Sequence, residues 1–183
     1  CGFAHTALNK DAASAFLRWV EKRRFPPKPE QAGLIDRVFG KEPIVMLQGP
    51  PGTGKTETLQ LAVLAHIAAH RATSRCRVLM VAPTHKAIQE FVTKLARCWQ
   101  EYITSGGRDL AELRIYRVLS GSRAAPIDGV SYVNYNEDEE TVKELTNCLT
   151  QQTTLSQDAS AAYPMVLCLT PPGLYGLMKK IGG

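Results

Sequence analysis

The chain carries Gly49-Pro50-Pro51-Gly52-Thr53-Gly54-Lys55-Thr56. This string satisfies the pattern G-x-x-x-x-G-K-[ST], a loop that follows a strand and opens a helix. Gly52 and Gly54 allow positive φ angles, so that backbone N–H groups curl inward around phosphate oxygens. Lys55 is expected to reach the β- and γ-phosphates, and the Thr56 hydroxyl to ligate Mg²⁺. The loop therefore predicts a site for a nucleoside triphosphate, namely ATP with Mg²⁺.

Apolar and helical patterns alternate on both sides of this loop. Short apolar runs predict buried strands at residues 43–48, 77–82, 114–119 and 165–169. Helical patterns cover residues 10–24, 30–39, 56–70 and 86–102, and a short helix is predicted after Pro172. Strands that alternate with helices indicate an α/β fold, a parallel sheet with flanking helices and right-handed crossovers.

The composition is that of an ordinary globular protein. Of the 183 residues, 44% are apolar and 21% are charged, and no apolar run approaches the roughly 20 residues that a membrane helix needs. Five scattered cysteines without a C-x-x-C pair encode neither a disulfide framework nor a zinc site. The net charge of +5 permits a polyanionic partner but does not demonstrate one. We expect no membrane association and an intracellular location, in the cytoplasm or the nucleus.

A longer string around the loop carries a family resemblance. Residues 48–58 read Gln48-Gly49-Pro50-Pro51-Gly52-Thr53-Gly54-Lys55-Thr56-Glu57-Thr58. This string resembles the first motif of superfamily 1 helicases, on the branch (superfamily 1B) that holds the RNA helicase of nonsense-mediated decay and its DNA and RNA relatives. The resemblance implies a RecA-like P-loop NTPase sheet, nucleotide contacts from residues 49–57, and catalysis that depends on Lys55 and Thr56. It also implies single-stranded RNA or DNA as the partner.

A glutamine upstream of the loop fits the same resemblance. In the family, such a glutamine reads the adenine edge, and here Pro29-Glu30-Gln31 precedes Gly49 at a similar spacing. The amide of Gln31 offers both a donor and an acceptor, as adenine recognition requires. The alternative is a solvated glutamine on a short helix.

Two later stretches resemble motifs that contact the nucleic-acid backbone. Thr84, His85 and Lys86 follow the predicted strand at 77–82, where ligands bind in open α/β sheets. The alternative is that Thr84 caps the helix that follows. Thr170 ends the predicted strand at 165–169 in the same way, although Pro171 and Pro172 replace the small residues usual in the family.

Four stretches of chain are expected. Residues 1–29 hold a helix and a Pro-rich linker, residues 30–119 the P-loop core, residues 120–163 an accessory insert, and residues 164–183 the continuation of the core. The insert is polar, is predicted to be partly helical over residues 139–149, and is long for a loop inside a compact domain. Its position is similar to that of an insertion in some helicase motor domains.

The acidic residues that complete catalysis have no clear place in this sequence. A motor of this family needs an acidic pair at the end of an apolar strand, but the acidic cluster at 137–140 follows the polar run at 132–136. The resemblance therefore implies that the acidic motif and the second motor domain, with its arginine finger, lie beyond Gly183. We expect this chain alone to bind nucleotide weakly and to hydrolyse it little.

Other interpretations stay open. The loop also occurs in AAA-type ATPases that remodel proteins, but those enzymes have a strand ending in Asp-Glu near the position of residues 105–115, where this sequence has Ser105-Gly106-Gly107-Arg108-Asp109. A nucleotide-binding module that only scaffolds a partner is a third possibility. His66 and His70 have a spacing compatible with a metal pair, without further ligands nearby in sequence.

Overall fold

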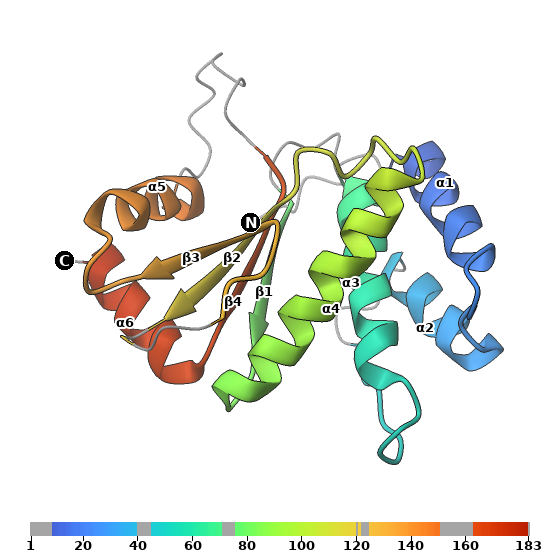
Figure 1. Ribbon diagram of the computed structural model, residues 1–183, viewed down its shortest axis with the longest axis horizontal. Coiled ribbons are helices and arrows are strands. Elements are labelled where there is room, and N and C mark those ends of the chain that lie inside the picture. The colour runs from blue at the N-terminus through green and yellow to red at the C-terminus, as the bar shows by residue number, and fades with distance from the viewer. Residues whose placement is uncertain are drawn as a thin grey trace, which may run out of the picture. The chain divides into compact units, whose positions relative to one another are not determined.

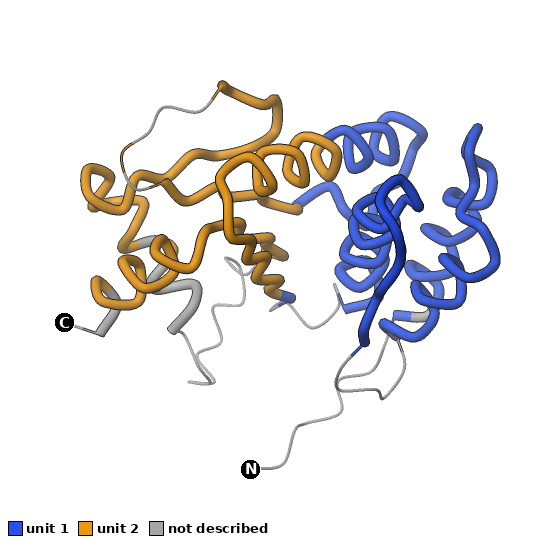
Figure 2. The backbone as a smooth tube through the Cα atoms, turned by 90° about the horizontal axis from the view of Figure 1, so that it is seen from below, with its two compact units in different colours: residues 1–76, 97–112 blue, residues 77–96, 113–183 orange. Residues whose placement is uncertain are grey.

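The computed structural model describes residues 9–39, 45–70, 76–119, 121, 125–150 and 163–182. The chain divides into two compact units, which Figure 2 shows in different colours. Unit 1 comprises residues 1–76 and 97–112, and unit 2 comprises residues 77–96 and 113–183. Helix α4 (His85–Thr104) contributes residues to both units.

Unit 1 is helical in the part that the structure describes. Helix α1 (Lys10–Glu21) begins after Asn9, whose side chain accepts a hydrogen bond from the amide of Ala12 at 3.1 Å. Helix α2 (Pro29–Phe39) starts with a proline, which has no N–H to leave unpaired at a first helical position. Helix α3 (Lys55–His70) is apolar around most of its circumference and contacts both α1 and α2. It therefore forms the buried centre of this unit.

Aromatic rings fix α1 against the C-terminal part of α4 within unit 1. The centroid of the Phe16 ring lies 5.5 Å from that of Trp19 and 5.1 Å from that of Tyr102. The centroids of the Trp19 and Tyr102 rings are 5.1 Å apart. Edge-to-face and tilted pairs at these separations stabilise aromatic clusters beyond their burial. The Trp19 ring also carries the guanidinium of Arg23 at 5.4 Å from its centroid.

Unit 2 contains a sheet of four strands: β1 (Arg77–Val81), β2 (Arg114–Leu119), β3 (Val130–Asn134) and β4 (Met165–Leu169). The spatial order is β1-β4-β2-β3, and every neighbouring pair is parallel (Figure 1). The carboxyl ends of all four strands therefore lie at one edge of the sheet. This arrangement confirms the predicted α/β fold with a parallel sheet and flanking helices.

The two faces of the sheet differ in what covers them. Tyr116, Val118 and Leu167 belong to an apolar cluster that also holds residues of α5 (Glu139–Thr150) and α6 (Pro171–Gly182). Because side chains alternate along a strand, Arg117 lies on the opposite face. There it contacts the first turn of α4 through the carbonyl oxygen of His85.

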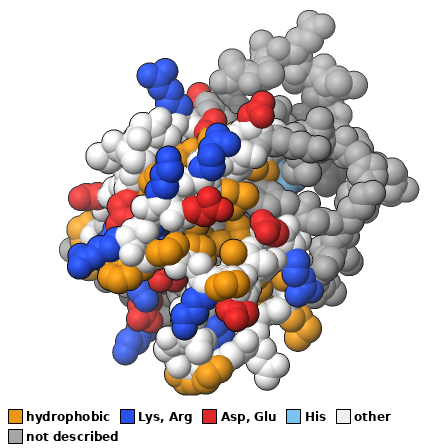
Figure 3. Space-filling model, turned by 90° about the vertical axis from the view of Figure 1, so that its right-hand side faces the viewer, with side chains coloured by type: hydrophobic (Ala, Val, Ile, Leu, Met, Phe, Trp, Pro, Cys, Tyr) orange, Lys and Arg blue, Asp and Glu red, His pale blue; other side chains and the backbone are white. Residues whose placement is uncertain are grey.

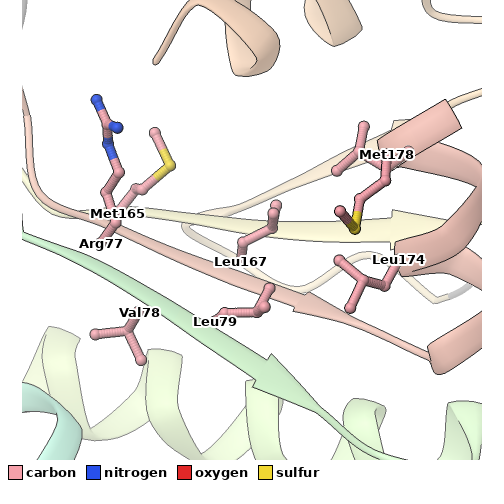
Figure 4. Close-up of a pocket in the computed structure, with 8 residues that line it drawn as sticks. Arg77, Val78, Leu79, Met165, Leu167, Leu174 and Met178 are labelled. Atoms are coloured by element: carbon pink, nitrogen blue, oxygen red, sulfur yellow. The ribbon is translucent and has the colours of Figure 1, made fainter. Parts of the chain in front are cut away.

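Strand β1 forms one edge of this sheet, and an apolar groove lies beside it. Leu79 and Val81 are 52% and 42% exposed on β1. Figure 4 shows the groove, which is lined by Arg77, Val78, Leu79, Met165, Leu167, Leu174, Leu177 and Met178. An exposed apolar edge strand is a surface that folded proteins usually cover or pair.

Most predicted elements are confirmed, with two differences. The strands at 114–119 and 165–169 have the predicted bounds, and the helices shift by a few residues at their ends. The predicted strand at 43–48 is wrong for Val45–Gln48, which has irregular backbone, while residues 43 and 44 lie outside the described residues. Met46 is 82% exposed there, and a buried strand needs neighbours to satisfy its N–H and C=O groups.

The other difference falls in the predicted insert. Its described part supplies strand β3, which pairs with β2 in the sheet, at a place where the sequence suggested only polar loop. It also supplies α5, close to the predicted helix at 139–149. Whether this stretch is an accessory insertion stays a prediction.

Two further features concern the cysteines and the helices of the described part of the chain. Cys76, Cys98 and Cys168 are free and buried, and burial raises the pKa of the Cys98 and Cys168 thiols to about 12. No helix within the described ranges is long and apolar enough to cross a membrane.

A matched pair of leucines tests the role of the apolar cluster. Leu167 is 2% exposed and pairs in register with Leu79, which is 52% exposed. Leu167→Ala should lower the free energy of unfolding by about 2–5 kcal/mol because it leaves a cavity. Leu79→Ala should lower it by less than about 1 kcal/mol. Urea denaturation measures both, and equal losses would contradict the assignment of the core.

Candidate nucleotide-binding site and nucleic-acid interface

The glycine loop of unit 1 has the predicted backbone shape. Gly52 and Gly54 have φ angles of 80° and 77°, a region that other residues rarely adopt. The Thr53 hydroxyl donates to the carbonyl oxygen of Pro50 at 2.9 Å. The Lys55 ammonium donates to the carbonyl oxygens of Gly49 and Pro50, at 2.6 Å each. The loop thus curls around its own lysine, and the ammonium lies on the concave side.

Helix α3 begins directly at this loop, as predicted. The Thr58 amide and hydroxyl both donate to the carbonyl oxygen of Gly54, at 2.9 and 3.0 Å, and so fix the first turn. The first amide groups of a helix lack acceptors within it, and the helix dipole adds positive charge there. Thr56 is exposed on this turn. The loop and the helix start together favour an anion.

Gln31 connects α2 to the loop. Its Nε2 donates to the carbonyl oxygen of Thr53 at 3.0 Å, and its Oε1 accepts from the amide of Lys28 at 2.7 Å. A Cβ atom at Gly54 would lie 2.7 Å from this Nε2, so only glycine fits there without a shift. The structure therefore brings Gln31 together with the phosphate loop, although the two are far apart in sequence.

An open cleft of about 300 Å³ lies between the loop and the Pro-rich segment. Its lining residues are Phe25, Pro26, Pro27, Lys28, Gln31, Gly52, Thr53, Gly54, Glu57, Thr58 and Leu61. The volume is within the range of small-molecule sites. Phe25, which is 72% exposed, and the adjacent prolines were missed by the sequence reasoning. The one sequence signal for Phe25 and these prolines is the Pro-rich run, which indicates only a linker.

Glu57 has a structural partner at the rim of the cleft. The Arg23 guanidinium lies 3.3 Å from its carboxylate and 3.4 Å from that of Glu101. Both carboxylates are about half exposed, so these ion pairs contribute little to stability. They do orient Glu57 toward Arg23.

Thr84 and Thr170 both cap helices at the carboxyl edge of the sheet in unit 2. Thr84 Oγ1 accepts from the amide of Ala87 at 3.2 Å, so the capping interpretation of this residue is what the structure shows. Thr170 Oγ1 accepts from the amide of Gly173 at 3.3 Å, and Thr170 is 6% exposed. The ends of β1 and β4 adjoin each other, since the Ala82 amide donates to the Leu169 carbonyl oxygen at 3.3 Å.

These contacts bring the two predicted strand-binding stretches to one place. Thr84, His85 and Lys86 are exposed and follow β1, while Thr170 follows the neighbouring strand β4. Helix α4 starts at His85, one residue earlier than predicted, and α6 starts at Pro171. Contact of these residues with a nucleic acid stays a prediction.

His66 and His70 face each other on α3 in a way that explains them without a metal. The rings are 4.1 Å apart, and His70 Nδ1 lies 2.8 Å from the carbonyl oxygen of His66. Burial, together with the charge of His70, lowers the pKa of His66 to about 4. No group of three or more potential metal ligands occurs among the described residues.

Charge does not gather on the face of unit 1 that carries α1 and α2. Figure 3 shows that Lys and Arg side chains stand among Asp and Glu side chains there, around a central apolar area. The excess of positive charge in the sequence therefore does not mark this face as a binding surface for a polyanion.

Comparison with known proteins assigns the chain to a family. A family described as "AAA domain" matches residues 27–163, well over half of the chain. The "Regulator of nonsense transcripts 1 homolog" of Arabidopsis thaliana is 30% identical over 135 residues, which cover 70% of this chain and 9% of that protein. The "ATP-dependent helicase upf1" of Schizosaccharomyces pombe is 31% identical over 141 residues, 73% of this chain and 14% of that protein. No solved structure matches the chain.

The chain belongs to the AAA-domain family, with the phosphate loop inside the matched region. Within it, the chain is of the type of the superfamily 1 helicases that include Upf1. It spans less than a sixth of the length of these curated relatives.

Protonation of His66 should make stability depend on pH. Its pKa is about 4 in the folded chain and 6.5 in the unfolded chain, so between these values the unfolded state binds the proton more readily. The free energy of unfolding should therefore fall as the pH drops from 6.5 toward 4. In His66→Gln this contribution should vanish, and the curve of stability against pH should be flatter in that window. Denaturant titrations at a series of pH values measure this, and parallel curves for the two proteins would contradict the burial of the ring.

Proposed function

We propose that this chain is the nucleotide-binding part of an ATP-dependent helicase or translocase that acts on single-stranded RNA or DNA. One arrangement carries the proposal: Gln31 lies against the phosphate loop at the rim of a cleft. A nucleotide with its phosphates in the loop has room for its base beside Gln31. The relatives are named as an ATP-dependent helicase and as regulators of nonsense transcripts, which supports the same activity.

The Gln31 amide is suited to recognise adenine. One of its N–H groups is engaged by Thr53 and one acceptor position by Lys28, which fixes the orientation of the amide. A primary amide has two N–H groups and two lone pairs, so one donor and one acceptor are left for the base. Guanine presents the opposite arrangement of donor and acceptor at its six position, and an amide held in one orientation discriminates against it. Phe25, exposed beside the cleft, offers an apolar surface for the ring.

The loop and the start of α3 are suited to hold the phosphates and Mg²⁺. Lys55 already lies on the concave side of the loop, held by two carbonyl oxygens, and phosphate oxygens are stronger partners for an ammonium than carbonyls. The exposed Thr56 hydroxyl supplies one oxygen ligand, which suits a small cation that keeps several waters and phosphate oxygens. Bound Mg²⁺ would neutralise charge that develops on the phosphates during hydrolysis. Gly49, Pro50, Pro51, Gly52, Thr53 and Gly54 supply the backbone that surrounds them.

Hydrolysis would be completed by parts of the motor other than the residues described. The acidic motif and the second motor domain are proposed to come from other parts of the motor, so the described residues alone would turn over ATP slowly. An intracellular location, in the cytoplasm or nucleus, fits such a motor. The remodelling ATPase is less well supported, because the relatives are helicases and residues 105–109 form the turn after α4 rather than a strand. No observation favours the interpretation that the chain is a nucleotide-binding module that only scaffolds a partner.

Two substitutions separate phosphate binding from base recognition. Lys55→Ala should weaken the binding of both ATP and GTP by at least about tenfold, since a charge-assisted partner of the phosphates is lost. Gln31→Ala should weaken ATP binding more than GTP binding and so lower the preference for adenine. Titration with fluorescent analogues of both nucleotides, checked by calorimetry, measures the ratio. Unchanged ATP affinity in Lys55→Ala would refute the site, and an unchanged preference in Gln31→Ala would refute only the adenine contact.

Two lysines of α4 test the nucleic-acid interface. Lys86 lies in the first turn and Lys94 about two turns further along, and both are exposed. Lys86→Ala should weaken the binding of oligo(U) and oligo(dT) to a similar degree, and it should lower the slope of log affinity against log salt by about 1. Lys94→Ala should change neither quantity. Fluorescence anisotropy at several salt concentrations measures both, and equal effects of the two variants would place the strand elsewhere.

A further inference from the structure

Arg117 is a buried cation with no paired anion among the residues that the structure describes. It lies on β2 with 3% of its surface exposed. Its Nε and Nη1 atoms have no hydrogen-bond partner in the part of the chain that the structure describes. Its Nη2 donates to the carbonyl oxygen of His85 over a long 3.4 Å, and the ring of Tyr132 has its centroid 5.9 Å from Cζ. The ion pairs found between described residues involve Arg23 and not Arg117.

A buried arginine whose polar atoms lack partners needs a physical explanation. A buried charge is costly unless it is paired, and polar atoms without partners in a folded chain call for a ligand or partner that completes them. Replacing an unpaired buried charge by an apolar side chain of similar size tends to stabilise a protein. The stability of this sheet therefore does not explain why an arginine occupies this position.

The place of Arg117 points to an anion. It lies beneath the first turn of the long helix α4, in contact with its first residue, His85. Thr84 accepts the hydrogen bonds of the Ala87 and Ile88 amides. The amides of His85 and Lys86 have no acceptor among the described residues, as is usual for a first turn. The helix dipole and a buried guanidinium thus add positive potential at the same turn.

The surroundings add to this potential. The start of α6 lies at the adjoining end of β4, because the Ala82 amide bonds to the Leu169 carbonyl oxygen. Lys86 is an exposed cation on the α4 turn itself. Ligands of open parallel sheets bind at this carboxyl edge. Two helix starts, a surface lysine and a buried arginine therefore converge on one small area.

We propose that Arg117 is a positioning residue for a strand phosphate at the first turn of α4, the stretch already expected to contact the nucleic-acid backbone. This rests on the proposed function and adds to it Arg117, which no motif resemblance assigned. The phosphate meets the free amides of His85 and Lys86 from outside. Arg117 acts from below as a positioning residue: it holds the His85 carbonyl and supplies a charge that low surrounding dielectric leaves largely unscreened.

The proposal predicts a specific pattern for substitutions of Arg117. Arg117→Met, which keeps the volume and removes the charge, should weaken oligo(U) and oligo(dT) binding by about tenfold and lower the salt slope by about 1. Arg117→Lys keeps the charge and should retain most of both. ATP affinity should stay the same in both variants, which separates a strand phosphate from the phosphates of the nucleotide. Urea unfolding should show Arg117→Met to be at least as stable as the parent chain.

A second pair of variants gives a test that does not depend on the buried site. Asp and Asn are both good N-caps of nearly equal shape, so Thr84→Asp and Thr84→Asn should preserve α4 equally. The aspartate repels a phosphate at the turn, and it should therefore weaken strand binding about tenfold more than the asparagine does. Inorganic phosphate should compete with the strand more weakly in Arg117→Met than in the parent chain.

The possible outcomes separate a failure of this inference from a failure of the proposed function. If the parent chain binds a strand through Lys86 but Arg117→Met binds it equally well with the same salt slope, the inference fails and the proposed function stands. If the loss in Arg117→Met tracks a loss of stability and Arg117→Lys does not restore binding, the arginine is structural and the inference fails. If Thr84→Asp and Thr84→Asn behave alike, no phosphate lies at the turn. If the parent chain binds no strand at all, the proposed function and the inference both fail.

Discussion

The hydrogen bond from Gln31 Nε2 to the Thr53 carbonyl oxygen is the contact on which the proposed nucleotide site depends. It holds the glycine loop against α2, and a Cβ at Gly54, whose φ is 77°, would displace the Gln31 amide. The same amide that anchors the loop also lines the cleft, so the proposed contact with the base would be mechanically linked to the shape of the phosphate loop. A shift of α2 would alter both at once, since Lys28 and Thr53 fix the amide from two sides.

At the carboxyl edge of the sheet, topology alone concentrates positive potential. All strands of the described sheet are parallel, so each helix that follows a strand begins at this edge with unpaired amides. Thr84 and Thr170 satisfy some of these amides by capping, and this is why both can resemble strand-contacting residues and serve as caps. Capping and ligand contact use different groups of the same turn. Arg117 adds a positive charge beneath this turn, and its Nε and Nη1 atoms have no hydrogen-bond partner among the described residues.

What the sequence could predict followed from local signals. The loop, with positive φ at Gly52 and Gly54, is encoded by residue types at fixed spacing. The buried strand at 165–169 is a continuous apolar run, and most residues of the strand at 114–119 are apolar. Strand β3 was missed because its polar residues give no such run, and its pairing with β2 is a tertiary contact. The strand predicted at 43–48 is wrong for residues 45–48 for the opposite reason: an apolar run becomes a strand only where neighbours pair with it. Arg117 stood inside an apolar run, and its missing partners are visible only in three dimensions.

The chemical groups at the carboxyl edge of the sheet limit how far a site there could recognise base sequence. Backbone amides, a lysine and a buried arginine are groups that recognise phosphate, and phosphate carries no sequence information. If the strand binds here, its affinity depends on salt and is nearly independent of base sequence, whether the sugar is ribose or deoxyribose. A motor that steps along a strand needs contacts with phosphates rather than bases, because tight binding to one particular base would oppose movement to the next nucleotide. Uniform phosphate contacts let successive nucleotides occupy the same turn of α4 with similar free energies, and translocation then requires only small free-energy differences between steps.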